Sequence, residues 1–212
     1  MSDRSPHVTP TLNASGSLSP EYFEQLYIQS ADPWEFATSP YEAAKYAATL
    51  AALPRRKYTS GLELGCSIGV LTRQLAPRCT ELLAIDVSAT ALREARERCA
   101  DLPHATFDNR DLTNDFPTGV FDLVLVSEIG YYFSKADLEL LRRKIANSLM
   151  PGGHLLLVHY TGRTNYPLTA DAVHETFLAW DGKVWTHAPG RGADGYRLDL
   201  FIKTTVIQME RG

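Results

Sequence analysis

The sequence predicts a doubly wound α/β fold with a seven-stranded, mostly parallel sheet, and three observations support this prediction. From residue 59 onward, short aliphatic runs alternate with amphipathic segments that carry an apolar stripe and a charged face. The aliphatic runs are bounded by Gly, Asp or Asn, which is typical of buried strands. The order strand, helix, strand, helix implies parallel strands joined by right-handed crossovers.

The individual elements follow from these runs in chain order. Parallel strands are expected at 61–65, 81–87, 105–109, 121–128 and 154–160, and helices at 69–77, 88–102, 135–150 and 169–180. Ser88 and Ser134 are suitable N-caps for two of these helices. Two last apolar runs, at 183–189 and 196–207, predict a terminal hairpin, with the glycine-rich residues 190–195 as its turn or as a longer loop.

The N-terminal part of the chain has a different composition. Residues 1–20 hold ten Ser, Thr or Pro residues, and we expect them to form a flexible tail. Residues 21–58 show apolar positions at helical spacing, interrupted at 32–36, and a Ser39-Pro40 pair suited to a helix start. We expect this segment to form a helical lid on the main domain, which spans residues 59–212.

Composition excludes several classes of protein. The length of 212 residues and the hydrophobic share of 44% fit a globular domain rather than a disordered or fibrous chain. A net charge of -4 disfavours a general nucleic-acid binder, which needs an excess of Lys and Arg to contact phosphates. The three cysteines form neither a disulfide framework nor a metal-ligand pattern, and no apolar run matches a signal peptide or a membrane span. We therefore expect a cytoplasmic protein without a metal, whose partners include neither nucleic acid nor a membrane.

The strongest local signal is the turn LELGCSIGVLT at residues 62–72. Gly65 and Gly69 lie between the end of a strand and the start of a helix, where missing side chains let a ligand approach the backbone. Asp86 ends the next strand, from where an acid can accept two hydrogen bonds from a ribose diol. An ordinary tight turn and a helix cap are the alternative interpretations, but the two features together favour a nucleoside-containing cofactor.

A nicotinamide cofactor uses the same layout with the fingerprint G-x-G-x-x-G. The corresponding positions here are Gly65, Ser67 and Val70, so one glycine of three is present. The count disfavours a dehydrogenase.

The combination resembles the class I S-adenosylmethionine-dependent methyltransferases. Their first motif, E/D-x-G-x-G-x-G, is matched by Glu63, Gly65 and Gly69, with Ser67 in place of the middle glycine. The resemblance covers about residues 59–160 and implies S-adenosylmethionine as methyl donor and S-adenosylhomocysteine as product. It also implies the cofactor contacts. The methionine part would contact the turn with Gly65, Cys66, Ser67 and Gly69, and would lie above Ser127 and Glu128. The ribose would contact Asp86, and the adenine would lie beside Val87 and Leu112, with its amino group at Asp111 or, as the rival, Asp108.

Three segments resemble one branch of these methyltransferases, the NodS type, more specifically. They are DPWEFATSPYEAAKY, LELGCSIGVLTRQLAPRC and LVSEIGYYF. Its members N-methylate a deacetylated amino sugar in a chito-oligosaccharide. This similarity runs from about residue 30 to 160 and implies that Lys45 replaces an arginine of the family, with the methionine carboxylate as its contact. Trp34 and Tyr41 would belong to a lid over the cofactor, with packing of the N-terminal helices onto the sheet as the alternative.

The candidate acceptor residues follow the fourth and fifth strands, because ligands of such sheets bind outside the carboxyl ends of strands. Tyr131 and Tyr132 are expected there, one as a pocket wall with its phenol at the acceptor and the other in the core. His159 is the candidate general base. The expected reaction is methyl transfer to a small-molecule acceptor, namely an amine on a sugar or related metabolite. O-methylation with His159 as base and a catalytically silent binding domain are the alternatives.

Overall fold

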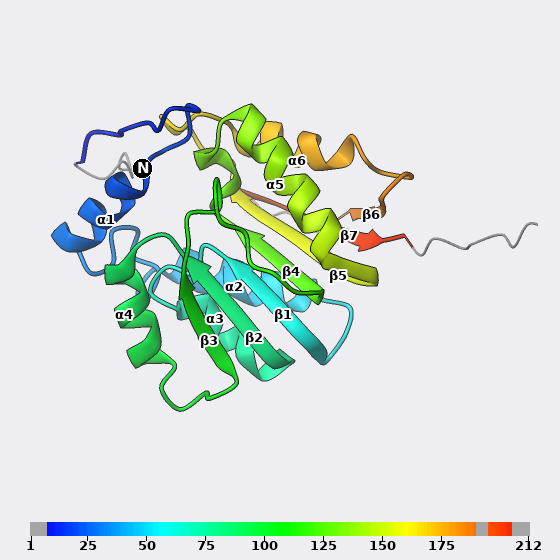
Figure 1. The fold of residues 1–212 in the computed structure, drawn as a ribbon. Coiled ribbons are helices and arrows are strands. Elements are labelled where there is room, and N and C mark those ends of the chain that lie inside the picture. Colours follow the sequence, from blue (N-terminus) through cyan, green and yellow to red (C-terminus); the bar gives the residue numbers. More distant parts are fainter. Residues whose placement is uncertain (1–7, 190–194, 205–212) are drawn as a thin grey trace, which may run out of the picture.

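The computed structural model describes residues 8–189 and 195–204. Seven strands form one sheet in the order β3-β2-β1-β4-β5-β7-β6 (Figure 1). Strands β1 to β5 are parallel, and β7 runs antiparallel to both β5 and β6. This arrangement confirms the predicted doubly wound, mostly parallel α/β fold. The strands are β1 (Tyr58–Leu64), β2 (Cys79–Asp86), β3 (Ala105–Asn109), β4 (Phe121–Ser127), β5 (Leu149–Tyr160), β6 (Trp185–Pro189) and β7 (Tyr196–Lys203).

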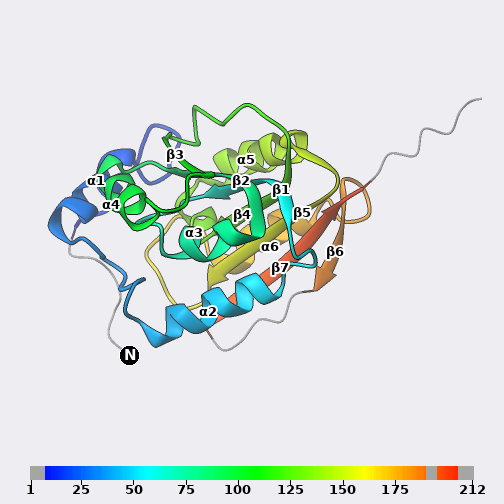
Figure 2. The ribbon, with the colours of Figure 1, turned by 90° about the horizontal axis from the view of Figure 1, so that it is seen from below.

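Helices cover both faces of the sheet (Figures 1 and 2). Alternate residues of the central strands serve the two faces: Val124 packs in one core with Leu141 and Phe177, whereas Leu123 packs in the other with Leu75. Helices α5 and α6 therefore lie on one face, and α2, α3 and α4 on the other. The helices are α1 (Pro20–Gln29), α2 (Pro40–Ala51), α3 (Val70–Leu75), α4 (Ala89–Arg98), α5 (Lys135–Ser148) and α6 (Ala170–Leu178), with 3-10 turns at Ala76–Arg78 and Gly130–Tyr132.

The largest difference from the predicted boundaries lies at β5. The Pro-Gly-Gly sequence at 151–153 predicts a turn, but the strand already begins at Leu149, which pairs with Phe121 of β4. The ladder between β4 and β5 shifts register between Phe121 and Leu123, and this irregularity accommodates the proline and glycines. The predicted turn at 190–195 lies almost wholly outside the described residues, as do residues 205–207 of the predicted last strand.

The prediction of a flexible tail at 1–20 is wrong for residues 8–20, whereas 1–7 lie outside the described residues. Leu18 is 5% exposed, and its N–H donates to the Tyr132 carbonyl at 2.8 Å. The Ser17 hydroxyl donates to Asp137 and accepts the Ser134 N–H. Composition misses this segment because the serines do not remain in water: their hydroxyls bind the N-terminal turn of α5. The Ser19 side chain then caps α1 by accepting from the Tyr22 N–H.

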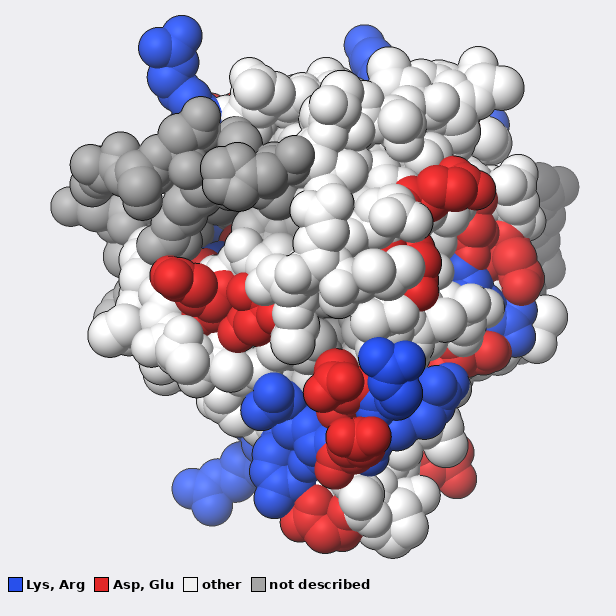
Figure 3. Space-filling model, turned by 90° about the vertical axis from the view of Figure 1, so that its left-hand side faces the viewer, with Lys and Arg blue, Asp and Glu red and all other residues white. Residues whose placement is uncertain are grey.

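The charged side chains of α4 lie on its outer face, where Arg93, Arg96 and Glu97 are exposed. Basic and acidic side chains intermix on this side of the molecule (Figure 3). Arg73, for example, is paired with Asp101 at 2.5 Å. No helix among the described residues is long and apolar enough to cross a membrane. Within the same residues, no group of three or more His, Cys, Asp or Glu side chains is arranged to hold a metal ion.

Candidate active site

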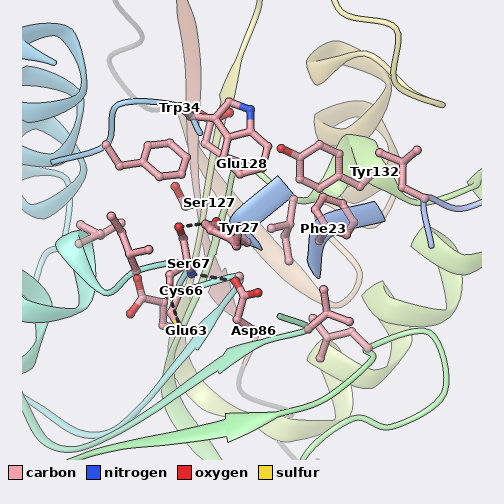
Figure 4. Close-up of a pocket in the computed structure, with 18 of the residues that line it drawn as sticks. Phe23, Tyr27, Trp34, Glu63, Cys66, Ser67, Asp86, Ser127, Glu128 and Tyr132 are labelled. Carbon is pink, nitrogen blue, oxygen red and sulfur yellow. Dashed lines mark hydrogen bonds between the residues drawn. The ribbon is translucent and has the colours of Figure 1, made fainter. Parts of the chain in front are cut away.

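A cavity lies at the carboxyl ends of β1, β2 and β4, between the sheet and the N-terminal segment (Figure 4). It contains about 980 Å³ of space, part of it open to solvent. Strand order reverses between β1 and β4, and ligands of open α/β sheets bind at this switch point.

The turn after β1 forms the floor of the cavity. Gly65 has a φ of +80°, and a Cβ there would lie 2.1 Å from Ile129 Cγ2. Gly69 has a φ of +77°, and its Cβ would lie 3.0 Å from the Ala95 backbone. Both glycines are therefore required by conformation and by close approach. Ser67, at the motif position where a glycine is common, also adopts a positive φ of +52°, so the serine keeps the backbone shape at some conformational cost.

Asp86 closes this turn from the neighbouring strand. Its Oδ2 accepts the Ser67 N–H at 2.8 Å, and its Oδ1 accepts the Ser88 N–H at 2.9 Å. Burial raises the pKa of Asp86 to about 6, although these backbone donors act to lower it. The carboxylate is charged at neutral pH. Because a carboxylate offers about four lone-pair positions, each oxygen can accept one further hydrogen bond from a ligand.

Glu63 lies deeper in the same cavity and is 1% exposed. Burial raises the pKa of its carboxyl group to about 8. Its buried Oε2 atom has no hydrogen-bond partner of good geometry among the described residues, although the nearby Thr72 hydroxyl partly offsets the rise in pKa. An orphaned buried oxygen at a cavity is unusual, and it marks a place where a donor from a ligand would be stabilised.

The loop after β3 supplies another wall with Asp111 and Leu112, next to Val87. The Asp111 Oδ1 atom accepts from the N–H and the hydroxyl of Thr113 at 3.0 and 2.7 Å. Asp108, the alternative acid, is instead paired with Arg110 at 2.7 Å and does not line the cavity.

Glu128 is held by a buried ionic cluster behind the cavity wall. Its Oε1 accepts from Lys45 Nζ at 2.5 Å, and its Oε2 accepts from the Tyr131 hydroxyl and from the Tyr160 N–H. Lys45 also pairs with Glu42 at 2.8 Å. Burial alone would lower the pKa of Lys45, but the two carboxylates outweigh it and raise that pKa. Glu128 has a φ of +60°, a costly conformation for a non-glycine residue that these contacts maintain.

Aromatic rings from the N-terminal segment face this polar floor. Figure 4 shows Phe23, Tyr27 and Trp34 with Tyr132 on one side of the cavity, and Glu63 and Asp86 on the other. The ring centroids of Phe23 and Tyr132 are 4.8 Å apart. Every cavity-lining residue that the described N-terminal segment contributes up to residue 36 is apolar or aromatic.

The structure brings most of the sequence-predicted residues together. The following ones line the cavity: Trp34, Glu63, Gly65, Cys66, Ser67, Asp86, Val87, Asp111, Leu112, Ser127, Glu128 and Tyr132. Five predicted residues lie outside the cavity lining: Gly69, Tyr41, Lys45, Tyr131 and His159. Tyr41 donates its hydroxyl to the Gly195 carbonyl at 2.8 Å, and Lys45 binds two carboxylates of the protein.

The prediction that His159 faces the acceptor is corrected by the structure. Its side chain is 0% exposed and lies outside the cavity lining. Both ring nitrogens are engaged, Nε2 with the Gly130 N–H and Nδ1 with His174, each at 3.0 Å. Burial, the His174 ring and Lys45 lower the pKa of His159 well below 6.5. The position at the end of β5 is right, but its side chain points into the core, where it has no access to a substrate proton.

Sequence reasoning missed several lining residues, chiefly Leu18, Phe23, Tyr27, Phe36 and Ile129. Tyr27 is tied to the glycine turn through a hydrogen bond between its hydroxyl and the Ser67 hydroxyl. The apolar positions of α1 were visible as a helical pattern, but that pattern does not indicate which side of the sheet the helix covers.

Comparison with known proteins matches residues 22–159 of this chain to the family model described as Nodulation protein S (NodS). Nodulation protein S of Rhizobium tropici is 32% identical over 131 residues, which cover 61% of this chain and 55% of the relative. The protein of the same name from Bradyrhizobium diazoefficiens is 33% identical over 128 residues, which cover 59% and 61% of the two chains. These matches therefore span little more than half the length of the curated relatives.

The fold is similar to that of the N-methyltransferase NodS from Bradyrhizobium japonicum, whose crystal structure was solved in complex with S-adenosyl-L-homocysteine. The TM-score is 0.77 at 24% sequence identity, over 88% of this chain and 99% of the other. At this identity, the likeness establishes the fold.

Proposed function

This chain belongs to the NodS family, and from that premise we propose that it transfers a methyl group from S-adenosylmethionine to an amine on a sugar or related metabolite. The observation that carries the proposal is the pairing of the Gly65 turn with Asp86 in one open cavity at the switch point of the sheet. When bound, S-adenosylmethionine supplies an electrophilic methyl group on a sulfonium centre.

Three features of the cavity fit this cofactor. The two oxygens of Asp86 each retain lone pairs after accepting one backbone N–H, which suits the two hydroxyls of a ribose. Gly65 lines the cavity, and its missing side chain leaves room for Ile129, so the turn stays close to the ligand space. The orphaned Oε2 of Glu63 offers an acceptor to the amino group of the methionine moiety.

The remaining cofactor contacts are proposed from the cavity lining. Asp111 and Leu112 lie on the loop after β3, with Val87 beside them, and together they form a site for an adenine ring. Ser127 ends β4 and Glu128 follows it, both under the region assigned to the methionine moiety. Gly69 supports the turn without lining the cavity.

The N-terminal segment acts as a lid that excludes water from the reacting groups. Methyl transfer gains mainly from holding donor and acceptor in line in a dry site. Trp34 and Phe23 supply an apolar cover over the cavity. Tyr41 and Lys45 anchor α2 behind the cavity instead, through the Gly195 carbonyl and through Glu128.

The chemistry of the lining favours an amine over an alcohol as acceptor. A neutral amine is already nucleophilic, whereas an alcohol needs a base to remove its proton. No histidine lines the cavity within the described part of the chain, and both oxygens of Glu128 are engaged, by Lys45, the Tyr131 hydroxyl and the Tyr160 N–H. Burial raises the pKa of Tyr132 well above 10, so its hydroxyl stays protonated and can orient an acceptor but not deprotonate it.

Two measurements test this function on the full chain. Calorimetry should detect binding of S-adenosylhomocysteine and none of NAD. Methyl transfer from labelled S-adenosylmethionine is then followed on matched acceptors, namely glucosamine, its N-acetylated form and a phenol. Activity on glucosamine alone supports N-methylation of an amino sugar, and activity on the phenol contradicts it. Binding of S-adenosylhomocysteine without turnover on any amine, sugar or phenol would favour a catalytically silent domain.

A further inference from the structure

A continuous chain of hydrogen bonds links the cavity wall to β7 along the face of the sheet that α6 covers. The Gly130 N–H donates to His159 Nε2 at 3.0 Å, His159 Nδ1 lies 3.0 Å from His174 Nε2, and His174 Nδ1 lies 2.6 Å from Asp199 Oδ2. Both histidines are 0% exposed, and Asp199 is 5% exposed. These hydrogen bonds join the turn after β4 to β5, α6 and β7.

The two ends of this chain fix the position of every proton in it. A backbone N–H can only donate, so His159 Nε2 carries no hydrogen and the neutral ring bears its proton on Nδ1. That N–H must donate to His174 Nε2, which leaves the His174 proton on Nδ1, where it donates to the Asp199 carboxylate. Asp199 is anchored in turn by Arg197 at 2.8 Å and His187 at 2.7 Å.

The turn held at Gly130 is part of the cavity wall. Glu128 and Ile129 precede it and line the cavity, and Ile129 packs against Gly65. The contact is tight, because a Cβ at Gly130 would lie 2.5 Å from Val173 Cγ1 and 2.8 Å from His159 Nε2. The positive φ of Glu128 means that this turn needs support from both sides, and the Glu128 N–H donates to the Val158 carbonyl on the other side at 2.9 Å.

We propose that His159 and His174 are positioning residues for the methyl-transfer site, and that one proton added to the pair releases Gly130 and lowers turnover. This proposal rests on the proposed function. An added proton would put N–H groups on both facing nitrogens, or else move one to His159 Nε2, where it faces the Gly130 N–H. In the first case the His159–His174 bond that positions the His159 ring is lost, and in the second case the bond between the Gly130 N–H and His159 is lost.

The surroundings keep the pair neutral at physiological pH. Burial lowers the pKa of both rings below 6.5, and for His174 it outweighs the opposing effect of Asp199. The proton therefore enters only under acid conditions. The titratable or charged groups that face the pair from the packed elements are Lys45 on α2, Glu128 and Tyr131 after β4, Asp171 and Glu175 on α6, and His187, Arg197 and Asp199 on β6 and β7.

The test combines imidazole and amide NMR with kinetics on the full chain. At pH 7.5, both His159 and His174 should show the Nδ1–H tautomer. On acidification below pH 6.5, a one-proton step should change both rings and shift the Gly130 amide resonance at the same pH. A Gly130 amide that does not respond in that step would overturn the proposal, whether or not the protein transfers methyl groups.

Variants separate positioning from folding. His174→Gln keeps an oxygen that can accept the His159 N–H, but the glutamine cannot take up a proton and leaves His159 as the one titrating ring of the pair. The pH at which its kcat falls on acidification (the acid limb), at saturating cofactor, should therefore shift away from that of the wild type. At pH 7.5 its kcat should exceed that of His174→Ala, which we expect to be reduced about tenfold. An acid limb unchanged in His174→Gln would refute the proposal.

His154→Gln is the matched control, because His154 is a second buried histidine of β5. Its Nδ1 atom lies 2.8 Å from the Tyr58 hydroxyl, and neither residue lines the cavity. It should leave the acid limb where it is, and a shifted limb in this variant would also count against the proposal. Absence of S-adenosylhomocysteine binding to the wild type at pH 7.5 would refute the proposed function instead, and the NMR titration would still judge the hydrogen-bond chain.

Discussion

Ile129 and Gly65 face each other so closely that a Cβ on the glycine would lie 2.1 Å from Ile129 Cγ2. The two residues come from the turns after β4 and β1, the neighbouring strands between which the strand order reverses. Their contact joins the glycine turn to the turn that carries Glu128, so the two walls of the cavity are set relative to each other by one side chain.

Gly65→Ala should therefore destabilise the fold by more than its backbone conformation alone requires. A positive φ costs an alanine about 1–2 kcal/mol, and the clash with Ile129 adds to this. Gly182→Ala is the control, since Gly182 has a φ of +70° and no atom within 4 Å of its added Cβ. Urea unfolding should show the larger loss for Gly65→Ala, and Ile129→Ala in the same chain should recover part of it. Equal losses at the two glycines would contradict the contact.

Glu63 should make the cofactor-free protein less stable as the pH rises. Its pKa is raised from 4.5 to about 8 in the folded state, so the folded protein holds a proton that the unfolded chain releases between these values. The stabilisation is complete below pH 4.5 and is lost as the pH rises through 8. Between pH 6 and 9, the free energy of unfolding should fall by about 2–3 kcal/mol.

Urea unfolding at these two pH values checks this expectation. Glu63→Gln should remove most of the fall, whereas Glu81→Gln, at an exposed position of β2, should leave it in place. If the wild type and Glu63→Gln respond equally to pH, the buried carboxyl is not the source.

The sequence allowed the central part of the site to be predicted because each feature there leaves a local signature. Gly65 and Gly69 have the positive φ values that a glycine pair in a strand–helix turn implies, and Asp86 ends its strand as the apolar run indicates. The parallel order of the strands then brings these residues to one edge. Every step depends on neighbours in sequence or on sheet topology.

His159 shows where this reasoning stops. The alternation along β5 cannot tell which face its last residues point to, because both faces of a central strand are buried and apolar. A histidine at a strand end is compatible with a base in a cavity and with a core hydrogen bond. The partners that decide between them, Gly130 and His174, lie 29 and 15 residues away in sequence.

Leu18→Ala should weaken both the fold and the proposed lid. Leu18 is 5% exposed, lines the cavity and packs with Tyr22 and Leu26. Truncation of a buried leucine costs about 2–5 kcal/mol, and the low end applies to this small cluster. Leu12→Ala is the control in the same segment, because Leu12 is 60% exposed. Thermal unfolding and the KM for the acceptor should change for Leu18→Ala alone, and an equal change for Leu12→Ala would contradict the role of Leu18.

Asp86→Asn should lower the affinity for S-adenosylhomocysteine about ten- to a hundred-fold, because a hydrogen bond to a charged group contributes about 1.5–3 kcal/mol. The variant also perturbs the bonds to Ser67 and Ser88, so the loss must be assigned by changing the ligand as well. An analogue without the two ribose hydroxyls should bind the wild type and Asp86→Asn almost equally. This coupling between residue and ligand is the signature of a direct contact.

These affinities are measured by calorimetry for the two ligands with wild type and variant. The same four measurements with Asp111→Asn in place of Asp86→Asn should show no coupling to the ribose hydroxyls, since Asp111 is assigned to the adenine. The pH dependence gives an independent check on Asp86. Its pKa is raised to about 6, so wild-type affinity should fall as the pH drops through 6, when the carboxylate takes up a proton and loses acceptor capacity. Asp86→Asn has no such proton to gain, and its affinity should stay flat over that range. A wild-type affinity that is flat from pH 7.5 to 5 would contradict the assignment of Asp86 to the ribose. So would an Asp86→Asn substitution that weakens binding of the analogue by the same factor as binding of S-adenosylhomocysteine.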